Sequence, residues 1–338
     1  MIHHSLRRDE LPDRLGVLDQ QIVAALQVNG RATWREIARL VRSSESTVAR
    51  RAQALISSGA VRSTVIMDPI KCGLGYPVLL QFRCEPAKGR QVALTLAARP
   101  DVRFVTVVTG PFDVVAELVV PSKRHLAHFL FEELGQIDGV SHTSTETVLR
   151  NFKTAYDWSR NLLGTNVAGE SAPQHEGLQS KQVDLDDLDR QLCERLRADG
   201  RSGFPQLALE LDITESMARR RVEALMTAGA LQPITLVDPR LLGYDIELMI
   251  WLQVEPTRLE EAAVALAARP EVRYLSATTG YSDLVGEVIL RSQDELYTFR
   301  IQTLGAMSEI RSVDMALELQ TLKRAFLLLD EALGYSPV

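Results

Sequence analysis

Apolar residues recur with helical spacing in three short stretches near the start of the chain. Leu18, Ile22 and Leu26 form the first apolar stripe. Two further stripes follow within residues 34–41 and 48–55. The pattern therefore predicts three short helices in succession.

The third of these helices has the features of a helix that lies in a DNA groove. Ser44 is a good N-cap, because its hydroxyl group can accept a hydrogen bond from the first turn. Val48, Ala52 and Leu55 make an apolar stripe, and polar side chains project from the opposite side. Such a trio of helices is typical of a helix-turn-helix. The β-branched residues of 61–67 predict a short strand after it, as a wing.

The next stretch has a different periodicity. Residues 78–84 alternate between apolar and polar side chains, as in a strand, and a helical pattern follows. Residues 102–120 read as a hairpin, with a turn at its middle. A second helix and a last strand, over 140–149, complete the order β-α-β-β-α-β, which is the ferredoxin-like plan.

The chain repeats itself with an offset of 170 residues. Gly30-Arg31 reappears as Gly200-Arg201, and about 40 of roughly 136 gapless pairs are identical. Because the period is so long, we interpret the chain as two copies of a two-domain unit rather than as a solenoid. The expected divisions are 14–69 (helix-turn-helix 1), 70–158 (ferredoxin-like domain 1), 159–184 (linker), 185–239 (helix-turn-helix 2) and 240–338 (ferredoxin-like domain 2).

Arginine and hydroxyl side chains around the third helix are the candidates for DNA contact. Arginine can pair with guanine or clamp a phosphate, and hydroxyl groups suit either partner. Arg51 lies nearer the apolar stripe, so we expect it to hold a phosphate or a neighbouring helix rather than a base. The full candidate set, with its counterparts in the second copy, is Arg42, Ser44, Ser46, Thr47, Arg50, Arg51, Ser216, Arg220 and Arg221.

In this order and in duplicate, the motifs resemble those of the Lrp/AsnC (feast/famine) family of transcription regulators. They are Leu-Asp at each start, S/T-x-x-x-x-x-R-R in the third helix, G-A-[VL] after it, an Asp-Pro joint and a T-G-x-x-D turn. The resemblance implies an α+β fold: two copies of a winged helix-turn-helix followed by a ferredoxin-like effector domain. It also implies sequence-specific binding to double-stranded DNA, homo-oligomers, and a small effector, often an amino acid.

The T-G-x-x-D turns are the candidate effector sites. Glycine allows a positive φ and lets backbone N–H groups face a carboxylate, whereas aspartate could bind an amine. A plain hairpin turn, in which these residues serve geometry alone, is an equally good interpretation. The candidate residues are Thr109, Gly110, Asp113, Thr279, Gly280 and Asp283.

The two helix-turn-helix copies differ in two respects. The family usually has a Gly-Leu pair before the recognition helix, but this chain has Arg42-Ser43 and Asp212-Ile213, so Arg42 must adopt a glycine-like conformation. Residues 18–69 hold 7 arginines and 4 acids, whereas residues 188–239 hold 7 arginines and 8 acids. Since phosphate contacts dominate affinity, we expect the first copy to bind DNA more strongly. Its helix is surrounded by Arg31, Arg35, Arg39 and Arg42, while Glu210 and Asp212 flank the second.

Composition limits the compartment and the kinds of ligand that we expect for this protein. No apolar run is long enough to cross a membrane and no secretory signal is visible, so we expect a cytoplasmic protein that does not bind membranes. The 3 cysteines show no metal-binding spacing, and we expect reduced, packed thiols. The net charge of −6 leaves room for a small basic face. His125 and His128 could form half of a metal site, but no third ligand is evident, so we expect neither metal nor cofactor.

Two other functions compete with a non-enzymatic regulator. Siroheme decarboxylases look like this family and also occur as paired units. They would need histidines to protonate their substrate. Here His142 has no partner in the repeat. The third hypothesis is a ligand-binding module without DNA binding.

The last expectation concerns assembly within the chain. A sheet covered by helices on one face needs a cover for the other face. We expect the sheet face carrying Val78, Leu80 and Phe82, or the opposite face, to meet its counterpart in the second copy, so that one chain imitates a dimer.

Overall fold

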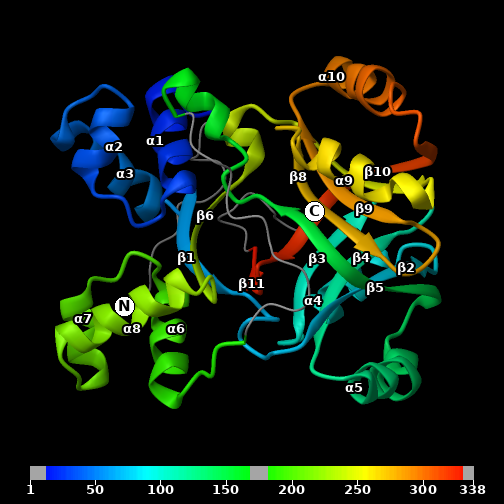
Figure 1. The fold of residues 1–338 in the computed structure, drawn as a ribbon, viewed down its shortest axis with the longest axis horizontal. Helices are drawn as coiled ribbons and strands as arrows, with labels where there is room; N and C mark the ends of the chain where they lie inside the picture. The colour runs from blue at the N-terminus through cyan, green and yellow to red at the C-terminus, as the bar shows by residue number, and fades with distance from the viewer. Residues whose placement is uncertain (1–12, 168–181, 330–338) are drawn as a thin grey trace.

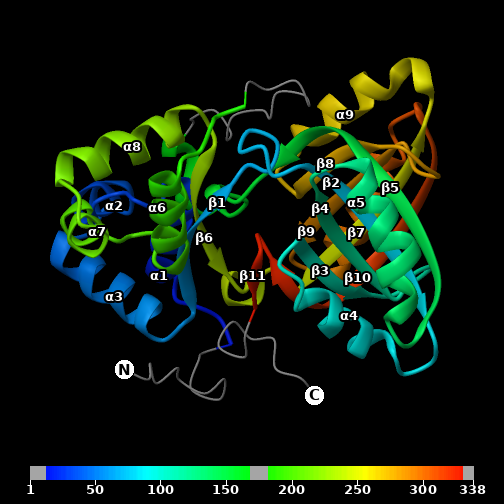
Figure 2. The ribbon, with the colours of Figure 1, turned by 90° about the horizontal axis from the view of Figure 1, so that it is seen from below.

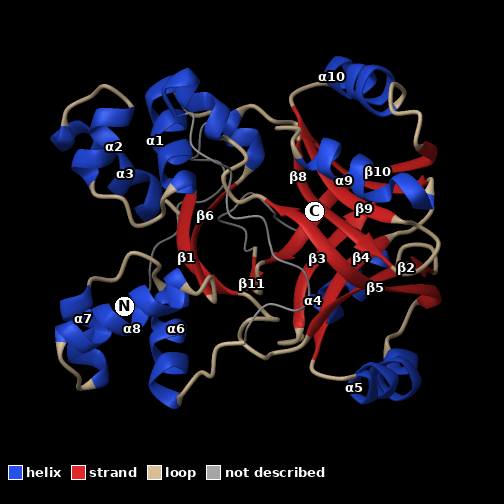
Figure 3. Cartoon of the chain, viewed as in Figure 1, coloured by secondary structure: helices blue, strands red, loops and turns tan. Residues whose placement is uncertain are grey.

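The computed structural model describes residues 13–167 and 182–329. These residues form two lobes (Figure 1): a helical lobe built around two paired strands, and a lobe of strands with helices on its outside, as the secondary-structure colouring in Figure 3 makes clear. Most of the linker expected at 159–184 lies outside the described residues. Its first part forms 3-10 turns over Arg160–Val167, and Leu163 is buried there in the core of the helical lobe.

Each copy contributes three helices and one strand to the helical lobe. Thr33 caps the second helix in a reciprocal capping box with Glu36, and Ser44 caps the third. The elements are α1 (Val17–Val28), α2 (Trp34–Leu40), α3 (Glu45–Ser57) and β1 (Val61–Met67), then α6 (Asp187–Ala198), α7 (Phe204–Leu211), α8 (Glu215–Thr227) and β6 (Leu231–Val237).

The second lobe contains the order β-α-β-β-α-β twice, as the sequence predicts. The first copy has β2 (Tyr76–Cys84), α4 (Gly89–Ala97), β3 (Val102–Val108), β4 (Val114–Val120), α5 (Lys123–His128) and β5 (Val140–Thr154). The second has β7 (Ile246–Val254), α9 (Leu259–Ala267), β8 (Val272–Thr278), β9 (Leu284–Leu290), α10 (Gln293–Thr298) and β10 (Ile310–Arg324), followed by the short β11 (Leu327–Leu328). Helices α5 and α10 each continue into a π-helical turn.

The two sheets of the chain meet face to face, which confirms that the copies assemble with each other. Val78, Leu80 and Phe82 pack under the helices of their own copy. The opposite face of β2 provides the contact between copies, where Leu79 lies in one buried cluster with Trp251 of β7. Of the two faces that the sequence left open, it is therefore the second that meets its counterpart.

Two long strands pass from one copy to the other. The first part of β5 pairs with β2 of its own copy, and its end pairs with β8 of the second copy. In the same way β10 pairs first with β7 and then with β3 of the first copy. Both strands have 15 residues. This exchange joins the strands of both copies into one continuous hydrogen-bonded sheet.

The helical lobe is held together by pairing of the two copies as well. Strand β1 runs antiparallel to β6, and Thr64 lies opposite Ile234. These two residues are equivalent in the repeat, so an internal two-fold axis passes between them. Figure 2 shows this two-strand ribbon at the side of the helices that faces the second lobe.

Two arginines fasten the ribbon from both sides. Arg31 donates hydrogen bonds to the carbonyl oxygens of Gly200 (2.7 Å) and Ser202 (2.9 Å). Arg201 returns two such bonds to the first copy, at 2.6 and 2.8 Å. Its guanidinium carbon also lies 4.1 Å from the centre of the Trp34 ring, within the range of a cation–π contact. The repeated Gly-Arg pair is therefore a reciprocal clamp between the copies.

In the second copy, the close approach of strand β1 explains why this position is a glycine. A Cβ atom at Gly200 would lie 2.6 Å from the backbone nitrogen of Thr64. A side chain at this position would push β1 away from the loop that Arg31 binds.

We predict that Arg31→Ala destabilises the helical lobe by about 1–3 kcal/mol, because two carbonyl groups lose their donor and the guanidinium group of Arg31 no longer lies over the Phe204 ring, 5.1 Å from its centre. The matched control is Arg39→Ala, an exposed arginine of α2, which we expect to change stability by no more than about 0.5 kcal/mol. Urea unfolding followed by circular dichroism measures both. Equal stability of the two variants would contradict the clamp.

Candidate DNA-binding helices and effector turns

The outer face of α3 carries the small polar and arginine side chains that the sequence analysis singled out. Ser46 and Arg50 are exposed. Ser44 accepts a hydrogen bond from the backbone N–H of Thr47 at 3.2 Å and also contacts the Thr47 hydroxyl, so this pair serves mainly to cap the helix. The exposed positions and the cap are separate parts of the candidate DNA-binding set.

The equivalent face of α8 is also open. Thr214 caps this helix, and Ser216 and Arg220 are exposed. In Figure 2, α8 lies along the top and α3 along the bottom of the helical lobe, with α2 and α7 between them.

Arg51 and Arg221 form ion pairs with the first helix of their own copy. Nη1 of Arg51 lies 2.9 Å from both carboxylate oxygens of Asp19 on α1. Arg221 pairs with Asp189 of α6 at 3.0 Å. These ion pairs hold the third helix of each copy to the first, and DNA contact by the two arginines stays a prediction. For Arg51 this is the neighbouring-helix alternative of the sequence analysis.

The residues before the recognition helices adopt the conformation usual for glycine. Arg42 has a φ of 53° and Asp212 a φ of 52°. For residues with a side chain this left-handed conformation costs about 1–2 kcal/mol. The turn therefore keeps the geometry that a glycine would give it, and both exposed side chains point to solvent beside the helix.

Charged neighbours differ between the two helices, although less than the sequence suggests. Arg31 is half-buried in the clamp, so it does not belong to the positive surroundings of α3. Arg39 and Arg42 remain exposed beside that helix. Each helix also has an ion pair near its start: Glu45 of α3 lies 3.5 Å from Arg35, and Glu215 of α8 lies 3.0 Å from Arg219.

The threonines of the T-G-x-x-D turns lock the exchange of strands. Backbone N–H and Oγ1 of Thr109 form hydrogen bonds with the backbone C=O and N–H of Leu317 in β10, both at 2.9 Å. Thr279 forms the same pair of bonds with Thr147 in β5, again at 2.9 Å. Each threonine therefore fixes the point at which the long strand of the other copy arrives.

The aspartates of the same turns bind backbone rather than project freely. Oδ2 of Asp113 accepts a hydrogen bond from the backbone N–H of Cys84 at 2.7 Å. Oδ2 of Asp283 accepts one from Val254, also at 2.7 Å. These contacts give the turn residues a structural role, and effector binding there stays a prediction.

The glycines of the turns have the conformation that the sequence predicts. The φ angles are 87° for Gly110 and 142° for Gly280. Both lie in the range that favours glycine.

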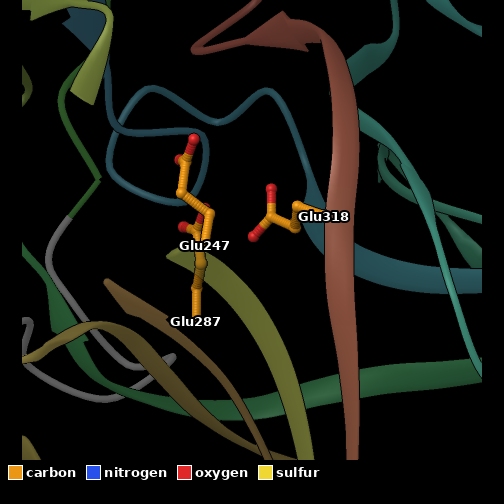
Figure 4. Close-up of side chains that lie close together, drawn as sticks. All are labelled: Glu247, Glu287 and Glu318. Atoms are coloured by element: carbon orange, nitrogen blue, oxygen red, sulfur yellow. The ribbon is translucent and has the colours of Figure 1, made fainter. Parts of the chain in front are cut away.

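A buried cluster of charges lies where the two sheets meet near the internal axis. The carboxylates of Glu247, Glu287 and Glu318 approach one another there (Figure 4), and their nearest ligand atoms lie within 4.8 Å. Arg273 pairs with Glu247 at 2.6 Å, and Arg324 pairs with Glu287 at 2.7 Å. Three acids and two guanidinium groups balance if one acid holds a proton.

The electrostatics identify that acid as Glu318. Burial raises its pKa well above its usual range, and the negative charges of Glu287 and Glu247 raise it further. For Glu287, burial is outweighed by the charges of Arg273 and Arg324, which hold its pKa below its usual range. With Glu318 protonated the cluster is neutral, so its charge balance requires no metal ion.

The sequence analysis missed this cluster. Glu247 and Glu318 have Pro77 and Val148 as counterparts in the first copy. A charged residue opposite an apolar one in the repeat is a signal that could have been read from the sequence alone.

The histidine pair is occupied by protein neighbours. His128 lies 3.3 Å from a carboxylate oxygen of Glu133, and Nδ1 of His125 lies 2.8 Å from the Ser122 hydroxyl.

Among the described residues, no helix is long and apolar enough to span a membrane.

We predict that the buried acid makes stability depend on pH. The folded chain binds a proton at Glu318 that the unfolded chain releases above about pH 4.3, so this contribution to stability falls as pH rises. The free energy of unfolding is expected to fall less between pH 5 and pH 8 in Glu318→Gln than in the wild type. The two slopes should differ by at most about 1.4 kcal/mol per pH unit. Urea unfolding across this range measures it. Glu132→Gln, an exposed control, should follow the wild type; a Glu318→Gln curve parallel to both would contradict the assignment.

Comparisons with known proteins agree with this architecture. The model of the AsnC-type helix-turn-helix domain matches residues 17–56. The model of the Lrp/AsnC ligand binding domain matches twice, at 78–158 and 247–328. These matches cover both ferredoxin-like copies and the first three helices.

Relatives with a single unit match part of this chain and nearly all of their own length. An uncharacterised HTH-type transcriptional regulator of Pyrococcus abyssi is 33% identical over 144 residues, which are 42% of this chain and 91% of the relative. The HTH-type transcriptional regulator FL11 of Pyrococcus horikoshii is 32% identical over 140 residues, 41% of this chain and 92% of the relative.

One solved structure resembles the chain over almost its whole length. The siroheme decarboxylase NirDL covers 91% of this chain and 93% of its own, with a TM-score of 0.59 and 16% identity. At this identity the likeness concerns the fold alone. The domain matches and the relatives show that the chain belongs to the Lrp/AsnC family of transcription regulators and carries the family's ligand-binding domain twice.

Proposed function

We propose that the chain is a sequence-specific DNA-binding transcription regulator that responds to a small effector such as an amino acid. The observation that carries the proposal is the reciprocal clamp of Arg31 and Arg201, together with the β1–β6 ribbon. Both hold α3 and α8 in one rigid lobe with their polar faces open. Two recognition helices at a fixed spacing suit two half-sites on one duplex.

In this proposal α6–α8 is a second helix-turn-helix. It has a capped third helix, a left-handed residue before that helix, and an arginine that ties the third helix to the first, as α1–α3 has. Ser216 and Arg220 then take the roles of Ser46 and Arg50.

The first helix is proposed to carry more of the affinity. Around α3 the exposed charges are Arg35, Arg39, Arg42 and Arg50 with Glu36 and Glu45, so positive charge prevails. Around α8 they are Arg219 and Arg220 with Glu210, Asp212, Glu215 and Glu223, so negative charge prevails. Each phosphate contact releases counterions, so the more positive face gains more at low salt.

The effector is proposed to act at the T-G-x-x-D turns. Each turn joins the two copies through its threonine, so a ligand there changes how the copies meet. We also propose that the chain forms homo-oligomers through exposed apolar side chains of the second lobe: Leu149 and Leu319, which are equivalent in the repeat, are 48% and 62% exposed.

An enzymatic role on the same scaffold has less support. His125, His128 and His142, the histidines of the described residues, are all exposed. We therefore favour the non-enzymatic regulator, a cytoplasmic protein.

We predict that Arg50→Ala weakens DNA binding more than Arg220→Ala does. The loss for Arg50→Ala is expected to be on the order of 1–3 kcal/mol if Arg50 contacts a base. Fragments selected from genomic DNA are the probe, and gel-shift titrations at two salt concentrations measure the affinities. Arg124→Ala, on exposed α5, is the matched control and should bind as the wild type does. A larger loss for Arg220→Ala would reverse the assignment.

We predict that an amino acid raises the melting temperature of the wild type through the turns. A panel of amino acids tested by thermal shift identifies it. Asp113→Ala combined with Asp283→Ala is expected to abolish the shift. Because both carboxylates also accept hydrogen bonds from backbone N–H groups, circular dichroism must show that the double variant is still folded. Absence of a shift with every amino acid would leave the effector proposal without support.

A further inference from the structure

The Gly280 turn already holds a carboxylate, and that carboxylate comes from the other copy. Glu146 of β5 is 1% exposed. Its Oε2 accepts a hydrogen bond from the hydroxyl group of Thr278, at 3.1 Å. A Cβ atom at Gly280 would lie 2.7 Å from Cγ of Glu146, so the glycine leaves the space that this side chain fills.

The turn surrounds the Glu146 carboxylate with donors. Burial raises the pKa of Glu146, while hydrogen bonds from Thr278 and from the backbone N–H groups of Ser282 and Tyr281 act in the opposite direction. Gln81, which is 2% exposed, faces the same carboxylate. Its amide nitrogen has no hydrogen-bond partner of normal geometry among the described residues. Backbone N–H groups in a glycine turn are a common way to bind an anion.

The Gly110 turn lacks the carboxylate and two of its donors. The counterpart of Glu146 is Ala316, and the counterpart of the Thr278 hydroxyl is the side chain of Val108. Pro111 stands where Tyr281 offers a backbone N–H. An apolar contact closes this turn instead, with the rings of Phe112 and Trp251 at a centroid distance of 5.9 Å.

We infer that the Gly280 turn is a binding site for a small carboxylate and that the chain fills it with its own Glu146. The rim of the turn is open to solvent: Gly280 is exposed, and Tyr281 is 71% exposed. A carboxylate from solution therefore reaches the site when Glu146 is removed or displaced. If the turns are effector sites, as proposed above, an effector with a carboxylate binds here in competition with Glu146.

The test is chemical rescue of the variant Glu146→Ala with acetate. Removal of the side chain takes the carboxylate away from the backbone N–H groups of Ser282 and Tyr281, and the Thr278 hydroxyl keeps only the carbonyl oxygen of Ser282, at 2.8 Å. The variant is therefore expected to melt below the wild type. Sodium acetate at neutral pH is expected to raise its melting temperature by at least about 2 °C over sodium chloride of equal concentration. The wild type should show no such difference, because its site is full.

The matched control is Leu79→Ala. This side chain is buried in the same layer between the sheets, at 2% exposure, and its removal leaves an apolar cavity. Acetate should not rescue it. A Glu146→Ala variant that acetate does not stabilise more than chloride, or an equal response of Leu79→Ala, would overturn the inference.

The test remains decisive if Glu146→Ala does not fold without a ligand. Refolding from urea in acetate and in chloride then asks the same question, with the yield of folded chain as the readout. Higher yield in acetate supports the site, and equal yields overturn it. The outcome is separate from the effector screen, because acetate can rescue the variant even if no amino acid binds the wild type.

Discussion

The structure depends on the pairing of the two copies with each other. Neither sheet is complete alone, because the end of β5 finds its partner in β8 and the end of β10 finds its partner in β3. The same pairing appears in the helical lobe, where β1 and β6 have no other strand beside them. Since a two-stranded ribbon is marginal by itself, its packing against both sets of helices stabilises it. Helices α3 and α8 therefore take their relative position from contacts between the copies.

One chain with two copies can do what a dimer of identical chains cannot. In a symmetric dimer every substitution appears on both sides of the axis. Here Glu318 corresponds to Val148 in the repeat, so this carboxylate occurs in one copy only. The two guanidinium groups of Arg273 and Arg324 can then pair with Glu247 and Glu287, and one proton on Glu318 completes the balance.

The same freedom separates the two turns and the two three-helix units. Glu146 seals one turn with a carboxylate, and Phe112 seals the other with a ring. Asp212 and Glu223 are exposed beside α8, where Arg42 and Gln53 are exposed beside α3. The features that hold the halves together, namely the Gly-Arg clamp and the threonines of the turns, are the same in both copies.

The sequence by itself determined the elements and their duplication. Apolar periodicity predicted the helices around Ile22 and Val48, and alternation predicted the strand at 78–84, because these patterns follow from the geometry of a single segment. The positive φ of Arg42 was also foreseeable, since the turn before the helix requires it. Tertiary structure decided what each polar side chain binds. Arg31 contacts Gly200, Arg51 contacts Asp19 and Glu146 enters the turn of the other copy. These partners lie far apart in the sequence, and no local pattern records which distant backbone or carboxylate a folded chain brings within hydrogen-bond distance.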